Sequence, residues 1–108
     1  MIPYGRQSID EEDIKAVNEV LKSDYLTTGP KIEEFEKTVA DYVGAKYAVA
    51  VSSGTAALHI ACLATGIGEG DEVIVSPITF VASANCVLYC GGTPVFADID
   101  SDTYNIDP

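Results

Sequence analysis

The stretch YAVAVSSGTAALHIACLATG, residues 47–66, decides the fold class of this chain. It begins with a continuous apolar run, which predicts a strand covered on both faces at residues 47–51. A helical pattern follows from Thr55 to about Thr65 and stops at Gly66. Only a short turn of serine, glycine and threonine joins the two, so a buried strand is predicted to lead directly into a helix.

Strands and helices continue to alternate after this stretch. Short apolar strands are predicted at residues 72–76 and 94–98, with a helix at about residues 80–89 between them. The order strand, helix, strand, helix, strand predicts a βαβαβ unit with parallel strands, and therefore an α/β fold. The unit has few helices to cover its strands and ends in an acidic tail, IDSDTYNIDP, which is predicted to be a loop. We therefore expect residues 47–108 to be the incomplete start of a larger domain.

Two helices are predicted before this unit, in an N-terminal helical segment at residues 1–46. Ser8 or Asp10 can cap the first helix, while Pro30 opens the second and Gly44 ends it. Each helix carries one apolar stripe, and the stripe of the second helix is expected to be its buried face. The first stripe consists of Ile14, Val17 and Leu21, and the second of Ile32, Phe35, Val39 and Tyr42 or Val43.

The charge of the chain excludes several classes of partner. A net charge of −11 at pH 7 argues against binding to nucleic acid or to an anionic membrane. No apolar run approaches the length of a membrane span, and the N-terminus lacks the pattern of a secretory signal. All the basic residues precede the serine-rich turn: Arg6, Lys15, Lys22, Lys31, Lys37 and Lys46. An anion at that turn would therefore depend on backbone amides and hydroxyls.

The cysteines and the single histidine are predicted to be structural. Cys62, Cys86 and Cys90 lie in apolar helical segments, and no further ligand completes the spacing of a zinc site. We expect no metal site, and we expect inert, buried thiols in a reducing cytoplasm. His59 has no acid or cysteine placed for triad chemistry, so a packing role is predicted.

The turn of Ser52, Ser53, Gly54 and Thr55, between the predicted strand at residues 47–51 and the helix that follows it, is a candidate anion site. In open α/β sheets, ligands bind beyond the carboxyl ends of the strands, which is where this turn is predicted to lie. The amides of Gly54, Thr55 and Ala56 are the unpaired donors of a helix start, and the glycine lets a phosphate approach the backbone. The alternative is that Ser52 or Ser53 merely caps the helix.

A second feature follows the next predicted strand. Phe80 comes after the proline turn Ser76–Thr79, so its ring can lie beside whatever the first turn holds. A flat aromatic ligand with a phosphate group would satisfy both features. The alternative is that Phe80 is an ordinary core residue.

Four motifs carry a family resemblance: YLTTGPKIEEFE, GAKYAVAVSSGTAALHIA, VIVSPITFVASAN and GGTPVFADID. In this order they resemble the DegT/DnrJ/EryC1/StrS family of sugar-nucleotide aminotransferases over essentially the whole chain. The resemblance implies the N-terminal part of a fold-type-I transferase that uses pyridoxal 5′-phosphate (PLP). The implied reaction moves an amino group from an amino acid, with glutamate expected, to C4 of a UDP-linked 4-keto-6-deoxy-N-acetyl hexosamine of the pseudaminic acid route. A homodimer is also implied.

The same resemblance assigns roles to residues. The implied cofactor contacts are Gly54, Thr55 and Ala56 for the phosphate, and Phe80 for the pyridine ring. The implied nucleotide-sugar contacts are Tyr4, Asp24, Tyr25, Leu26, Thr27 and Ser53. The family's Schiff-base lysine, the acid that pairs with the pyridine nitrogen and the serine before the lysine match nothing in this chain. No catalytic residue is therefore predicted, and the 108 residues alone are expected to be inactive.

Three alternatives stay open from the sequence. The chain can belong to a sibling aminotransferase, or to a dehydratase of the same group, that acts on another nucleotide sugar. It can be a truncated, inactive paralogue that lacks the lysine. It can also be an unrelated phosphate-binding α/β domain, which would bind no PLP.

Overall fold

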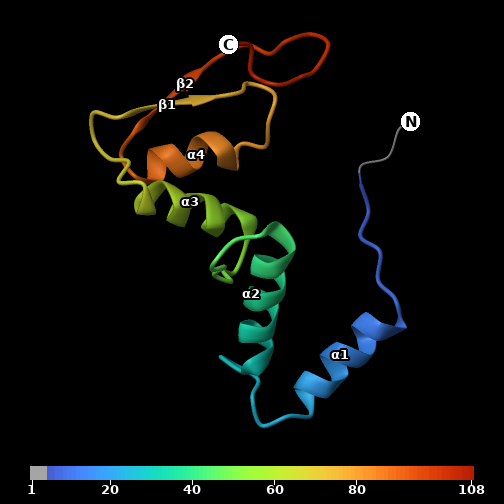
Figure 1. Ribbon diagram of the computed structural model, residues 1–108. Coiled ribbons are helices and arrows are strands. Elements are labelled where there is room, and N and C mark those ends of the chain that lie inside the picture. The colour runs from blue at the N-terminus through green and yellow to red at the C-terminus, as the bar shows by residue number, and fades with distance from the viewer. Residues whose placement is uncertain (1–4) are drawn as a thin grey trace. The chain divides into compact units, whose positions relative to one another are not determined.

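The computed structural model describes residues 5–108. The chain divides into two compact units, Met1–Ala50 and Val51–Pro108. Figure 1 shows the elements in chain order: α1 (Glu11–Leu21), α2 (Pro30–Val43), α3 (Gly54–Ala64), β1 (Glu72–Val75), α4 (Ala82–Tyr89) and β2 (Thr93–Phe96). Tyr4, an implied nucleotide-sugar contact, lies outside the described residues. A domain boundary between residues 46 and 47 stays a prediction.

Local signals set the ends of the helices in the first unit. Asp10, one of the two predicted caps, accepts hydrogen bonds from the amides of Glu12 at 2.9 Å and Asp13 at 3.1 Å. The Asp13 carboxylate accepts the Asp10 amide at 3.0 Å, which completes a capping box. Pro30 opens α2, and Gly44 ends it in the left-handed conformation at φ 69°, as predicted.

The prediction that the apolar stripe of the second helix is buried is wrong for the described structure, and the stripe of the first helix is exposed as well. In α1 no residue is buried, and in α2 only Ala40 is buried, with Val39 half-buried. The described residues of this unit hold two helices and no sheet, so no second layer covers the stripes. The exposed stripe residues are Ile14, Val17, Leu21, Ile32, Phe35, Tyr42 and Val43.

Residues 47–51 do not form the predicted strand. Tyr47 and Val49 are each 75% exposed, and the sheet of the described chain contains only β1 and β2. A strand needs a neighbouring backbone to pair its amides and carbonyls, and these residues have none. The Ala50 amide instead donates to the Glu36 carboxylate at 2.8 Å. The strand-forming composition of these residues is therefore not sufficient to make a strand. In place of the predicted βαβαβ unit, the described chain has α3 followed by a βαβ unit.

The second unit confirms the predicted parallel pairing and the α/β class. Strands β1 and β2 are parallel, with a register that runs from Glu72 opposite Thr93 to Val75 opposite Phe96. Helix α4 connects them and lies between α3 and the two-stranded sheet (Figure 1). It begins at Ala82, two residues later than predicted, because the loop after β1 continues through Phe80.

The core of this unit lies around α4. Val87 is only 1% exposed, and the other buried apolar residues of the unit are Val75, Ala82 and Cys86. Gly92 allows the chain to pass close to α4, because a Cβ there would lie 3.0 Å from Val87 Cγ1 and 2.9 Å from Ile67 Cγ2. Ile74, on the other face of β1, is 65% exposed. This face of β1 is therefore not covered within residues 5–108.

Candidate functional site

The start of α3 and the start of α4 enclose an open, largely apolar hollow of about 700 Å³. The structure thus brings together the two features that the sequence predicted separately, the turn at Gly54 and Thr55 and the ring of Phe80. The residues that line the hollow are Gly54, Thr55, Ala57, Leu58, Ala61, Phe80 and Ala82. A volume of this size lies within the range of ordinary ligand sites.

Ser53 caps the helix beside this hollow. Its hydroxyl oxygen accepts the Ala56 amide at 3.1 Å, and its carbonyl accepts the Ala57 amide at 3.0 Å. Helix capping, which the sequence left open as an alternative, is therefore present and uses Ser53. Of the three amides predicted to be bare, Ala56 is occupied. The amides of Gly54 and Thr55 have no acceptor within residues 5–108.

Gly54 leaves open space where a side chain would stand. A Cβ at this position would meet no atom within 4 Å, and the backbone does not adopt a positive φ. The fold itself therefore does not require glycine here. The open space matters for an approaching anion, which can contact the two free amides and the positive end of the α3 dipole.

Phe80 stands at the other side of the hollow with its ring 71% exposed. This exposure contradicts the alternative that Phe80 is an ordinary core residue in the described structure. Its ring therefore offers an apolar face to the hollow. An exposed aromatic ring of this kind can stack on a flat heterocycle.

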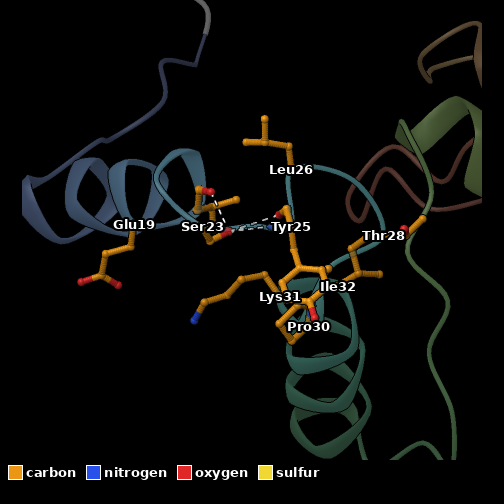
Figure 2. A pocket seen from close by; sticks show the side chains of 10 residues that line it. Glu19, Ser23, Tyr25, Leu26, Thr28, Pro30, Lys31 and Ile32 are labelled. Atoms are coloured by element: carbon orange, nitrogen blue, oxygen red, sulfur yellow. Dashed lines mark hydrogen bonds between the residues drawn. The ribbon is translucent and has the colours of Figure 1, made fainter.

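A second, smaller pocket of about 290 Å³ lies in the first unit (Figure 2). Its walls come from the end of α1, the connecting loop and the start of α2. Tyr25 and Leu26, two of the implied nucleotide-sugar contacts, line it, whereas Asp24 and Thr27 do not. The complete lining is Glu19, Val20, Ser23, Tyr25, Leu26, Thr28, Gly29, Pro30, Lys31 and Ile32.

Local contacts hold the loop of this pocket. The Ser23 hydroxyl donates to the Val20 carbonyl at 2.8 Å, and it accepts the Tyr25 amide at 3.2 Å (Figure 2). Gly29 fits closely, since a Cβ there would lie 2.8 Å from the Tyr25 Cβ. At the pocket rim, the hydrogen bond and the negative charge of Glu34 raise the pKa of Lys31. The Lys31 ammonium group is therefore paired with Glu34, which does not line the pocket.

The cysteines and the histidine lie at the packing between α3 and α4. Cys86 is buried, and Cys62 and Cys90 are half-buried, all as free thiols. Burial raises the pKa of Cys62 to about 11, and the neighbouring Cys86 and Cys90 add to the shift. The His59 ring meets the Tyr89 ring edge-on at 5.3 Å, which confirms its packing role. Residues 5–108 contain no group of three metal-ligating side chains.

Sequence reasoning missed the floor of the hollow. Ala57, Leu58 and Ala61 line it, although only the first residues of α3 were predicted to face a ligand. The signal was present in the spacing, because residues three, four and seven positions after Gly54 share its helix face. The missed link between Glu36 and Ala50 had no comparable signal, since its partners are fourteen residues apart.

The hollow of this α/β unit thus combines two amides at a helix start that have no acceptor among the described residues, an open glycine and an exposed aromatic ring. The chain belongs to the DegT/DnrJ/EryC1/StrS aminotransferase family, which residues 7–108 match. This result confirms the family that the sequence motifs indicated.

Individual relatives agree with this assignment. The spore coat polysaccharide biosynthesis protein SpsC of Bacillus subtilis is 56% identical over 99% of this chain and 28% of its own length. Spr1654 of Streptococcus pneumoniae, solved in PLP, pyridoxamine phosphate and apo forms, is 39% identical with a TM-score of 0.91, over 98% of this chain and 27% of its own. Helicobacter pylori PseC, an aminotransferase of pseudoaminic acid biosynthesis, is 42% identical with a TM-score of 0.89, over 97% and 29%.

The chain therefore spans a little over a quarter of the length of the relatives that it matches. These solved structures also support the fold class, the N-terminal part of a PLP-dependent transferase. Within the described residues, no helix is both long enough and apolar enough to cross a membrane.

Proposed function

We propose that the hollow of the second unit is part of the PLP site of a sugar-nucleotide aminotransferase. The observation that carries this proposal is the pair of free amides at Gly54 and Thr55 beside the exposed ring of Phe80. The dimensions and chemistry of the hollow fit the group, because one end offers donors to a phosphate and the other an apolar ring face. When bound, PLP supplies the electron sink that amino-group transfer requires.

The residues of the hollow have distinct proposed tasks. Gly54 and Thr55 donate their amides to the phosphate, and the Thr55 hydroxyl adds a third donor. Ala56 belongs to the same turn, but its amide is occupied by Ser53, so its contribution is the dipole of α3. Phe80 covers one face of the pyridine ring and excludes water from it. The proposed cofactor residues thus remain Gly54, Thr55, Ala56 and Phe80.

The proposed acceptor is a UDP-linked 4-keto-6-deoxy-N-acetyl hexosamine that is aminated at C4, and the proposed donor is glutamate. Family membership and the similarity to PseC support an activity like that of UDP-4-amino-4,6-dideoxy-N-acetyl-β-L-altrosamine transaminase. The proposed nucleotide-sugar contacts are Tyr4, Asp24, Tyr25, Leu26, Thr27 and Ser53. A cytoplasmic homodimer is proposed for the complete enzyme.

A second candidate acceptor is another nucleotide sugar. The observation that favours it is the higher identity to SpsC, 56%, than to PseC, 42%. The residues of the hollow serve either acceptor equally, because they are proposed to hold the cofactor and not the sugar. The two candidates therefore share one cofactor site and differ only in the substrate.

No residue of these 108 takes the role of the Schiff-base lysine in the proposal. The lysines of the chain all precede Ser52, and none has the sequence context of that residue. A PLP transaminase needs a lysine amine near the cofactor to move a proton. The proposal therefore assigns binding to this chain and the proton transfer to residues beyond it.

The test is a binding and transfer assay on the native protein that carries this sequence. We expect saturable binding of PLP with a new absorbance band, and amino transfer from glutamate to a UDP-linked 4-keto-6-deoxy sugar. Transfer only to dTDP- or GDP-linked keto sugars would favour the second candidate. Absence of any PLP binding would overturn the proposal.

A further inference from the structure

Two hydroxyl groups flank Phe80, one in the loop before α4 and one in the first turn of α4. The hydroxyls of Thr79 and Ser83 lie 3.0 Å apart and share a hydrogen bond. The Ser83 amide also donates to the Phe80 carbonyl at 3.0 Å. Ser83 thus holds the backbone of Phe80 directly, and through its side chain it holds the residue immediately before Phe80.

This hydroxyl pair matters because little else fixes Phe80. Its ring is 71% exposed, so no core packing holds it. Helix α4 has Val81 as its N-cap and no side-chain cap, so backbone hydrogen bonds such as that from the Ser83 amide to the Phe80 carbonyl link the loop to the helix start. The remaining side-chain bond of the loop lies nearer β1, where the Ser76 hydroxyl accepts the Ile78 amide at 3.3 Å. Thr79 and Ser83 therefore provide the side-chain constraint nearest to the ring.

We propose that Thr79 and Ser83 are positioning residues that hold Phe80 over the hollow. The inference rests on the proposed function, because it concerns the ring face that Phe80 offers to a bound pyridine. Without the hydrogen bond between the two hydroxyls, the loop allows the Phe80 ring to adopt other orientations. Fixing the ring again when the ligand binds costs conformational entropy and therefore weakens the affinity for the ligand. The phosphate end of the site, at Gly54 and Thr55, lies on α3 and does not depend on this hydroxyl pair.

The test uses the native protein freed of cofactor, with pyridoxamine 5′-phosphate as the probe because it has no aldehyde to react with surface lysines. Thr79→Val removes the hydroxyl while keeping the side-chain volume, and Ser83→Ala keeps the amide bond to Phe80. We expect each variant to bind the probe roughly threefold to tenfold more weakly, the range for loss of one net hydrogen bond. Thr79→Ser, which keeps a hydroxyl, is the rescue control and should bind like the wild type.

Two further measurements separate positioning from general damage. Inorganic phosphate should bind Thr79→Val as it binds the wild type, since a positioning role leaves the helix start intact. In a Phe80→Leu background, Thr79→Val should cause no further loss, because the hydroxyl pair acts through the ring. The inference would be overturned if Thr79→Val also weakened the binding of inorganic phosphate. It would also be overturned if the losses of probe affinity from Thr79→Val and Phe80→Leu were fully additive in the double variant.

The outcome also separates this inference from the proposed function. If the wild type binds pyridoxamine 5′-phosphate and Thr79→Val binds it equally well, the positioning role is wrong and the proposed cofactor site stands. If the wild type binds neither pyridoxamine 5′-phosphate nor phosphate, the cofactor site and the positioning role both fail.

Discussion

The two compact units use helices of similar length, but they secure them in different ways. In the second unit, α4 has no side-chain cap, yet three of its residues are buried between α3 and the sheet. In the first unit, α1 has a complete capping box, yet none of its residues is buried. One helix is held by packing and the other by local hydrogen bonds at its start.

This difference shows where each kind of binding feature can be built. The hollow at Phe80 lies where α3 and α4 pack together, so its walls are fixed by contacts distant in sequence. The pocket at Tyr25 lies in one continuous stretch, and the hydrogen bonds of Ser23 and the close fit of Gly29 shape it. Changes to packing should therefore affect the hollow, whereas the pocket at Tyr25 should respond only to changes in local bonds.

The largest effect is expected from Val87→Ala in the core of the second unit. Val87 is 1% exposed, so removing two methyl groups leaves a cavity that lowers the free energy of unfolding by about 1–3 kcal/mol. The matched control is Val17→Ala in α1, where the side chain is 59% exposed and a change within about 0.5 kcal/mol is expected. Urea denaturation with amide exchange resolved by unit measures both. Equal losses in the two variants would contradict the difference in packing.

A smaller but more specific effect is expected from Gly54→Val in the hollow. The new side chain has room in the fold but occupies the space where a phosphate would approach, so pyridoxamine 5′-phosphate should bind at least about tenfold more weakly. Gly5→Val is the matched control, because a Cβ there also meets nothing within 4 Å and its backbone φ is not positive. Titration followed by fluorescence measures both affinities. Unchanged affinity in Gly54→Val would remove the phosphate role of this turn.

The outcomes of the sequence predictions follow the same division. Asp10, Pro30 and Gly44 were placed correctly because caps and stops act within one helical turn. The parallel pairing of β1 and β2 was also predicted correctly, since the helix between them requires a crossover. The strand predicted at residues 47–51 was wrong, because a strand depends on a partner strand that composition does not reveal. The predicted burial of the α2 stripe was wrong for the same reason, since periodicity predicts an apolar face and not what covers it.

The candidate site was predictable in part for related reasons. Gly54, Thr55 and Phe80 were predicted from their places after strand-like runs, and the structure lines one hollow with all three. That Ser53 would occupy the Ala56 amide could not be decided, because a capping serine and a ligand-binding serine have the same sequence pattern. Asp24 and Thr27 lie outside the pocket that Tyr25 and Leu26 line, because neighbouring residues of a tight loop point in different directions.

In the first unit, Asp10→Ala should lower the stability of α1 by about 1 kcal/mol, the usual loss for an N-cap. The Asp10 carboxylate accepts two amides, so exchange at Glu12 and Asp13 should accelerate while exchange in α4 does not change. Ser8→Ala is the control, because Ser8 was the alternative cap and makes no hydrogen bond within residues 5–108. Amide exchange that accelerates equally in α4 would show that the two units are not independently secured.

The smallest effect concerns the turn after β2, where the bonds are again local. Amides of Thr103 and Asp102 and the Thr103 hydroxyl donate to the Asp100 carboxylate and hold its pKa below the ordinary value of 3.8. Because the folded pKa is the lower one, this stabilisation is present above pH 3.8 and is lost as the pH falls through the folded value. The pH midpoint of the change in the Thr103 amide shift should therefore lie below 3.8, and Asp100→Asn should abolish this change. A midpoint at or above 3.8 would show that these hydrogen bonds do not persist in solution. Local hydrogen bonds at an exposed turn would then need burial of the kind that α4 receives.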